Sequence, residues 1–141
     1  MQILMFGGEL NGEMSNQLLS MNTNSLKVSV TEVNNTRGML PCARKGHGMQ
    51  YWPKHDALLL ISGRNIDAEF LSDLHLYFLE RDFWLCLATS PKHMMRHNFG
   101  VALYITQFTI HQNLAYLFGG LNQNMFASNA LTSIYLQNEN E

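Results

Sequence analysis

Two of the six histidines have a spacing that suits a metal ion. His93 and His97 are four residues apart, which on a helix would place both imidazoles on one face, as helical zinc sites require. Pro91 precedes the pair, a strand is expected after it, and neither a cysteine pair nor a His-Glu motif lies near. The sequence therefore favours a polar loop over a zinc site, and we expect no metal and no cofactor.

The other chemistry-bearing residues form no catalytic motif. His47, His75 and His111 have no carboxylate or nucleophile at a motif spacing around them. Ser62 is not part of a G-x-S-x-G nucleophile elbow, and the phosphate-binding patterns G-x-x-x-x-G-K-[ST] and G-x-G-x-x-G do not occur. We expect no catalytic residues and predict that the protein is not an enzyme.

Three aromatic residues near basic ones imitate a stacking platform for single-stranded nucleic acid. They are Tyr51, Trp52 and Trp84, and the basic residues Arg44, Lys45 and Lys54 lie near the first two in the sequence. The net charge is −2, however, and the positive residues are scattered, so the basic surface of a duplex-binding protein is missing. A solvated turn between two strands explains residues 53–56 better, and we expect no nucleic-acid partner.

The chain length and the spacing of the cysteines limit the class of protein. The 141 residues suffice for one hydrophobic core and are too few for two ordinary domains. No apolar run approaches the about 20 residues of a membrane-spanning helix, and the first residues lack the features of a secretion signal. Cys42 and Cys86 have no C-x-x-C spacing, which favours reduced, structural thiols. We expect an intracellular protein, cytoplasmic or cytoskeletal, without a membrane partner.

The elements that must position any site are short strands. Apolar runs of strand length alternate with clusters of Asn, Gly and Ser that punctuate the chain too often for helices. The runs are 3–6, 17–21, 26–30, 57–61, 74–79, 83–87, 101–105, 114–118 and 131–136. Segment 70–84 fits helical spacing as well as period two, and we favour a strand there. The sequence predicts an all-β fold of successive antiparallel hairpins.

One short pattern, an apolar strand end followed by a glycine pair, occurs three times. It is present as Phe6-Gly7-Gly8, Ile61-Ser62-Gly63 and Phe118-Gly119-Gly120, at intervals of 55 and 57 residues. A second pattern is an arginine followed, three residues later, by an aromatic or histidine residue and then a glycine. It occurs at Arg44 to Gly48 and again 52 residues later at Arg96 to Gly100. Trp84 closes the middle repeat, and the equivalent position 56 residues earlier is Val28. These intervals indicate a repeat protein.

The combination resembles the kelch family of β-propellers, whose repeat joins an Arg-x-x-His/Phe opening, a double glycine, an Asn-Asp-Leu-like third strand and a tryptophan. The middle repeat has every element, with Ser62 in place of the first glycine; its residues are Arg44, His47, Ser62, Gly63, Asp73, Tyr77 and Trp84. The third repeat matches at Arg96, Phe99, Gly100, Gly119 and Gly120, and the first at Gly7 and Gly8 without a tryptophan. The resemblance covers nearly the whole chain, and it is favoured over a β-sandwich because the patterns recur in phase.

The resemblance implies a kelch-type arc of four-stranded antiparallel blades in an incomplete ring, with blades at about 1–36, 41–89 and 94–137. Strands are expected at about 3–7, 16–21 and 26–33, at 47–52, 57–63, 72–79 and 83–88, and at 99–106, 114–119 and 130–137. Arg44 and Arg96 would hydrogen-bond and pack between blades, and Trp84 would fill space between them. Since closed propellers have at least four blades, this arc of about two and a half would need further blades or neighbouring chains to cover its open edges.

The resemblance also implies a function. Kelch propellers serve as non-enzymatic scaffolds or adaptors, and we expect this role here, with other protein chains as partners. Contacts would come from the loops between strands, on two different faces of the arc. The candidate contact segments are 10–16, 34–42, 64–71, 90–97 and 121–128. The candidate contact residues are Arg64, Asn65, Met94, Met95, Asn122, Met125 and Phe126.

Two alternatives stay open. The first is a kelch-type enzyme or sugar-binding module, such as an oxidase or mutarotase. A copper centre of that kind would need Tyr, His and Cys ligands aimed together; Tyr77, His75 and Cys86 are present, but Tyr77 and His75 fit the ordinary strand pattern. The second alternative is a structural subunit of a large cytoskeletal or ciliary assembly. Metal content and activity toward sugars would separate the enzyme from a scaffold.

Overall fold

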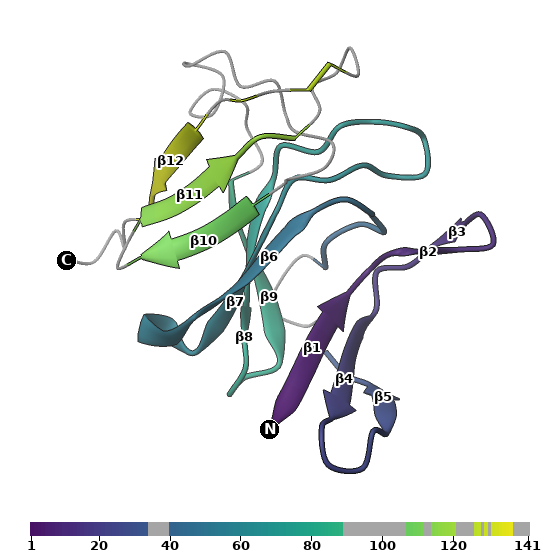
Figure 1. Cartoon of the computed structure of the whole chain (residues 1–141). Helices are drawn as coiled ribbons and strands as arrows, with labels where there is room; N and C mark the ends of the chain where they lie inside the picture. The colour runs from purple at the N-terminus through teal and green to yellow at the C-terminus, as the bar shows by residue number, and fades with distance from the viewer. Residues whose placement is uncertain are drawn as a thin grey trace.

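The computed structural model describes residues 1–33, 40–88, 107–111, 114–120, 126–127, 129 and 131–136. Over these residues the protein consists of short antiparallel strands and one single-turn 3-10 helix (Figure 1). The predicted all-β class is confirmed. Within this described part of the chain, no helix has the length and apolar character that crossing a membrane requires.

The first sheet contains β1 (Gln2–Phe6), β4 (Leu18–Asn22) and β5 (Val28–Val30), paired in that order. Between β1 and β4 the chain forms a small hairpin of β2 (Glu9–Leu10) and β3 (Glu13–Met14). Its two turn residues, Asn11 and Gly12, have φ of 52° and 83°. Positive φ at both positions is what a two-residue hairpin turn requires, and an Asn-Gly pair adopts it readily.

The middle sheet is a four-stranded meander of β6 (Gly48–Trp52), β7 (Ala57–Ile61), β8 (Leu74–Phe78) and β9 (Phe83–Ala88). The helix η1 (Pro53–His55) connects β6 to β7. All five residues of β7 are buried, which explains why its sequence is a continuous apolar run instead of an alternating one. β8 lies inside segment 70–84, where a strand was favoured over a helix.

The third sheet contains β10 (Gln107–His111), β11 (Leu114–Phe118) and β12 (Leu131–Tyr135), in that order. The strand that pairs with β11 is β10, and not 99–106, the range that the sequence predicts. Only two residues separate β10 from β11, and this short connection sets a register that places Ile110 opposite the buried Ala115. The sequence did not predict a strand at β10, and the predicted strand 99–106 lies outside the described residues.

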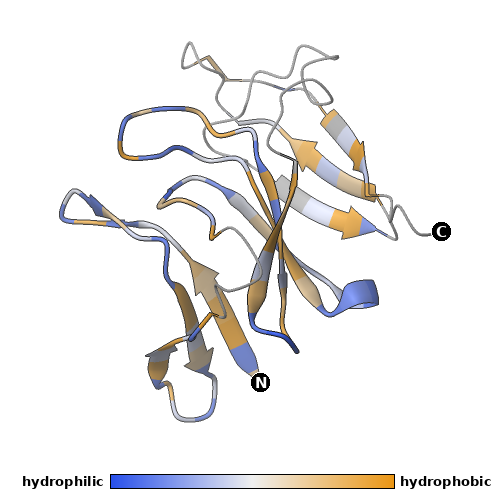
Figure 2. Cartoon of the chain, turned by 180° about the vertical axis from the view of Figure 1, so that it is seen from behind, coloured by the Kyte–Doolittle hydropathy of each residue, from blue (hydrophilic) through white to orange (hydrophobic). Residues whose placement is uncertain are grey.

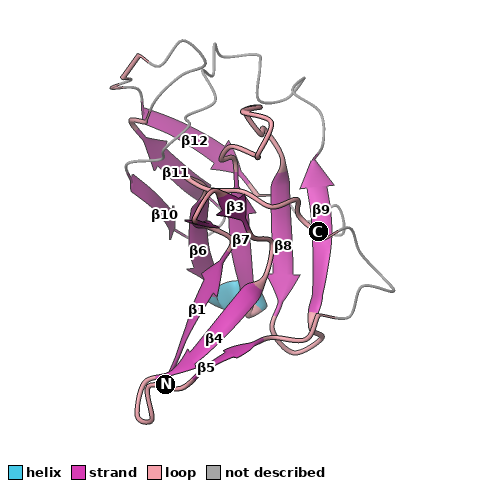
Figure 3. Ribbon diagram, turned by 90° about the vertical axis from the view of Figure 1, so that its right-hand side faces the viewer, coloured by secondary structure: helices cyan, strands magenta, loops and turns pink. Residues whose placement is uncertain are grey.

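The three sheets pack face to face in chain order, so the middle sheet is covered on both sides (Figures 1 and 3). Alternate residues of β7 serve the two interfaces: Leu59 and Ile61 pack toward the third sheet, and Leu58 and Leu60 toward the first. Apolar residues follow the strands, and polar residues are concentrated in the turns (Figure 2). Each core is therefore a layer between two sheets.

Candidate functional site

The three glycine pairs adopt one repeated backbone conformation. The two φ angles are 65° and 98° at Gly7 and Gly8, 60° and 104° at Ser62 and Gly63, and 72° and 100° at Gly119 and Gly120. Glycine enters this left-handed region readily, whereas an L-residue such as Ser62 enters it at a cost of about 1–2 kcal/mol. The sequence repeat is thus also a repeat of structure, with one strained copy in the middle sheet.

Residues 44–47 pass between the first and middle sheets beside these glycines. A Cβ on Gly7 would lie 2.6 Å from the Arg44 carbonyl oxygen, and a Cβ on Gly63 would lie 2.9 Å from the Lys45 carbonyl oxygen. The Gly8 N–H donates to the Arg44 carbonyl oxygen at 2.9 Å. The absence of side chains at these positions therefore lets one segment approach both sheets closely.

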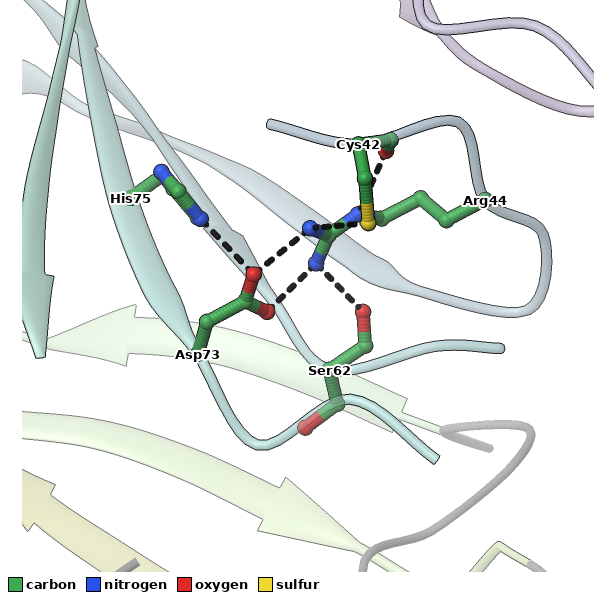
Figure 4. Close-up of polar contacts among 5 residues, drawn as sticks. All are labelled: Cys42, Arg44, Ser62, Asp73 and His75. Atoms are coloured by element: carbon green, nitrogen blue, oxygen red, sulfur yellow. Dashed lines mark hydrogen bonds and ion pairs between the residues drawn. The ribbon is translucent and has the colours of Figure 1, made fainter. Parts of the chain in front are cut away.

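Arg44 is the centre of a polar cluster at this junction (Figure 4). Its side chain has no solvent exposure, and its Nη1 and Nη2 donate to the two carboxylate oxygens of Asp73 at 2.5 and 2.6 Å. Nη1 also donates to the Ser62 carbonyl at 3.0 Å, and Nε to the Cys42 carbonyl at 3.1 Å. His75 Nε2 is hydrogen-bonded to the same carboxylate at 2.8 Å. The cluster ties segment 42–44 to the beginning of β8.

The Arg44–Asp73 pair stays ionised over the whole physiological range. Burial alone would lower the pKa of Arg44, but the hydrogen bonds and charge of Asp73 raise it above its ordinary value. Burial alone would raise the pKa of Asp73, but the hydrogen bonds from Arg44 and then His75 hold it well below its ordinary value. Since each charge is bound by the other, the arrangement stabilises a junction between sheets.

His47 precedes β6 and packs against the first sheet. Its ring centroid is 5.7 Å from that of Phe6, in edge-to-face contact. Burial, and then the positive charge of Arg44, lower the pKa of His47 from 6.5 to about 4. The imidazole is therefore neutral at pH 7.

The free energy of unfolding is expected to fall by about 2 kcal/mol as the pH drops from 6.5 toward 4. In this interval the unfolded chain binds a proton at His47, whose ordinary pKa is 6.5, while the folded chain does not, so acid favours unfolding. Urea unfolding at a series of pH values between 4 and 7 measures the fall, and His47→Gln should remove it. The same fall in that variant would contradict the assignment.

Trp84 lies on β9 and fills space between the first and middle sheets. It is 1% exposed, and its ring centroid is 5.1 Å from Phe6 on β1 and 5.2 Å from Tyr77 on β8. Its contacts therefore join two sheets. Val28, at the equivalent position of the first sheet, is 54% exposed, since no sheet of the described residues covers that face.

Two of the three side chains considered as copper ligands are hydrogen-bonded to different carboxylates. Tyr77 donates its hydroxyl hydrogen to Asp82 at 2.7 Å, His75 is bound to Asp73, and Cys86 lies on β9 opposite His75. Burial, and then the bond to Asp82, raise the pKa of Tyr77 well above its ordinary value. Among the residues that the structure describes, no three His, Cys, Asp or Glu side chains form a group suited to a metal ion.

Two of the predicted contact residues hold a loop in shape. Asn65 Nδ2 donates to the Glu69 carboxylate at 2.8 Å, and the Glu69 N–H donates to Asn65 Oδ1 at 2.9 Å. Arg64 and Lys45 exchange backbone hydrogen bonds of 2.9 and 3.0 Å. The exposed large apolar residue of this loop is Ile66, at 61%, and it lies within the predicted contact segment 64–71.

The hairpin β2–β3 and loop 64–71 lie at the same end of their sheets, and we call the surface that they form the loop end (Figure 1). Lys45, whose backbone is hydrogen-bonded to Arg64 of the loop, forms an ion pair with Glu9 of the hairpin. The apolar tip of the hairpin is Leu10, which is 75% exposed. A groove of about 540 Å³ runs along the hairpin from Leu10 to Gln17. The loop end also carries the exposed carboxylates of Glu13, Asp67 and Glu69.

The remaining predicted site residues are placed as follows. Phe126 is 68% exposed. Outside the described residues lie Met94, Met95, Arg96, Phe99, Gly100, Asn122 and Met125, together with the pair His93 and His97.

Comparison with known proteins identifies no matching family model and no matching curated protein. The kelch resemblance therefore depends on the residues quoted above and on the repeated conformation of the glycine pairs.

Proposed function

We propose that this protein is part of a kelch-type β-propeller and serves as a non-enzymatic scaffold that binds other proteins. Three antiparallel sheets that follow one another along the chain and pack face to face support the propeller. The same pair of φ angles after β1, β7 and β11 marks an equivalent strand in each sheet. Buried Arg44 and Trp84 join successive sheets as they would join blades.

The loop end is the observation that carries the binding role. Its two apolar tips, Leu10 and Ile66, are exposed, and the exposed carboxylates of Glu13, Asp67 and Glu69 lie in the same two segments. The charges of the Arg44 cluster, in contrast, are bound to one another. Exposed apolar side chains at loop tips, with a charged rim, are typical of surfaces that bind proteins. The rim is acidic, so the fitting partner is an apolar segment flanked by Lys or Arg.

Replacing Leu10 and Ile66 together by serine is expected to weaken partner binding roughly tenfold or more. Both side chains are exposed and belong to neither core, so the fold should not change. Affinity capture on the purified chain identifies the partner, and titration of that partner measures the change in Kd.

Leu26→Ser is the matched control for this double variant. Leu26 is 71% exposed, close to the exposure of Leu10, but it lies in the turn at the other end of the first sheet. Its replacement should leave Kd unchanged. Undiminished binding by the double variant, or an equal loss in the control, would contradict the loop end as the binding surface.

The outer face of the first sheet indicates that the arc has further neighbours. The cross-strand register aligns six apolar residues on this face in two rows, and Val28 and Val30 are each 54% exposed. Apolar sheet faces of this kind are normally covered. The rows are Ile3, Met21 and Val28, and Met5, Leu19 and Val30.

The chain made alone is expected to self-associate or aggregate, because this apolar face and the strand edges beside it are open. Sedimentation of the purified chain, with urea unfolding of the same sample, tests this. Val28→Thr and Val30→Thr together should reduce the association. A cooperatively folded monomer would contradict the propeller arc.

A further inference from the structure

One edge of the first sheet has no partner strand among the described residues. β1 pairs with β4 along its whole length, and no described strand pairs with its other edge. The equivalent strands are flanked on both sides: β7 lies between β6 and β8, and β11 between β10 and β12. The free edge of β1 thus corresponds to the edges that β6 and β10 cover in the other sheets.

A groove runs along this free edge. It has a volume of about 460 Å³ and lies between β1 and the middle sheet. Leu4 of β1 and Met49 and Leu58 of the middle sheet give it apolar walls, and Gln2 and Gln50 provide amides. Its remaining lining residues are Tyr51 and Leu79. The edge of β1 therefore opens onto a mainly apolar space.

The middle sheet shows what fills the corresponding space. Aligned on the glycine pairs, Gln2 corresponds to Ala57, and the residue opposite Ala57 is Trp52. Trp52 is 4% exposed and belongs to the core between the middle and third sheets. In the third sheet, the residue at this position is His111, which is exposed. The last residue of the covering strand thus has a ring in both the middle and the third sheet.

The two covering strands also share an alternating pattern. β6 has the sequence GMQYW and β10 has QFTIH. Both have large apolar residues at the second and fourth positions and an uncharged polar residue at the third. That third residue lies opposite the centre of the covered strand, as Gln50 lies opposite Leu59.

We propose that the groove beside β1 is a binding site for an extended peptide segment of a partner protein, which adds to the first sheet as an antiparallel strand. The segment has the pattern shared by β6 and β10, with its final ring residue opposite Gln2 and its first residue opposite Phe6. Backbone hydrogen bonds to β1 supply affinity, and the ring, held in the groove, supplies selectivity. This site is distinct from the loop end and does not depend on what the loop end binds.

A fluorescently labelled peptide that contains GMQYW between polar flanking residues tests the proposal. Titrated with the full chain, it should bind saturably, and hydrogen exchange in Gln2–Phe6 should slow when it is bound. Proline in place of the central Gln of the peptide should abolish binding, because proline lacks the N–H and does not fit a central strand position. A peptide with the ring residue replaced by serine should bind at least about fivefold more weakly.

Two chain variants separate this site from other surfaces. Tyr51→Ala removes a half-exposed wall of the groove and should weaken peptide binding, whereas Tyr135→Ala, at an exposed tyrosine of the third sheet, should not. The loop-end double variant should bind the peptide normally, so failure of the loop end would leave this result intact. Equal binding of the proline peptide, or no saturable binding, would overturn the proposal.

Discussion

Replacing Asp73 by alanine is expected to lower the free energy of unfolding by about 3–5 kcal/mol. Arg44 has no solvent exposure, and Asp73 accepts two hydrogen bonds from it, at 2.5 and 2.6 Å. Without that carboxylate the guanidinium would be a buried charge without a counter-charge, which is strongly unfavourable. Urea unfolding at pH 7, followed by circular dichroism, measures the loss.

Two further variants isolate the ion pair. Asp67→Ala makes the same chemical change on the exposed part of loop 64–71, and it should alter stability by no more than about 0.5 kcal/mol. Replacing both partners, as Arg44→Met with Asp73→Leu, should cost less than Asp73→Ala alone because no unpaired charge remains. An Asp73→Ala loss as small as that of Asp67→Ala would contradict the role assigned to the pair.

The fall of stability in acid provides a second test of the Arg44–Asp73 ion pair. Arg44 and His75 hold the pKa of Asp73 below its ordinary value, so in the unfolded chain this carboxyl binds a proton at a higher pH. Its contribution to stability is therefore complete above about pH 3.9 and is lost as the pH falls below that value. The loss occurs below the interval in which His47 titrates, so the two groups can be distinguished. The Asp73→Ala variant should lack the more acidic of the two losses.

Replacing Trp84 by alanine is expected to lower the free energy of unfolding by about 3–5 kcal/mol. The indole is 1% exposed and contacts Phe6 on β1 as well as Tyr77 on β8. Its removal leaves a cavity between two sheets, which no single sheet can close without moving relative to its neighbour. Hydrogen exchange should show faster exchange first in β1 and β4, since the first sheet is held to the rest across this layer.

The matched control for Trp84 is the next residue of the same strand. Leu85→Ala removes a large apolar side chain from β9, but Leu85 is 39% exposed and does not belong to either core. Its cost should be clearly smaller, about 1 kcal/mol or less. Equal losses at the two positions would show that Trp84 stabilises only its own sheet.

These two residues differ in kind from those that carry the proposed binding role. The side chains of Asp73 and Trp84 lie at sheet junctions and contact residues of the fold itself, whereas Leu10 and Ile66 are exposed at the tips of loops. Substitutions at the junctions should therefore lower stability and binding together. Substitutions at the tips should lower binding alone.

Much of the fold follows from local features of the chain. Short runs with strand propensity, separated by turn-forming residues, were enough to predict the all-β class and the strands of the middle sheet. The exception was β10, the partner of β11, because no strand was predicted at 107–111. Pairing depends on which strand the connection brings alongside, and apolar content does not report this.

The candidate site was predictable only in part. The residues Arg44 and Asp73 were recognised as members of a repeat, but they are 29 residues apart, and no local rule pairs them. The prediction treated Asn65 as a contact residue, although its side chain holds Glu69 within the loop. Leu10 and Ile66 lie within the predicted contact segments 10–16 and 64–71, but they were not singled out there, because the sequence does not indicate which apolar residues of a loop stay exposed.

The sequence by itself determined most of the turns and strands, because left-handed φ angles at the glycine pairs and alternating apolar residues are properties of a few neighbouring residues. Only the tertiary structure decided which carboxylate meets Arg44, which ring meets Trp84, and which edge and faces stay open. Those outcomes depend on how one sheet is placed against the next. Each of these contacts joins two residues that are far apart in the chain, so the local sequence around either residue does not predict it.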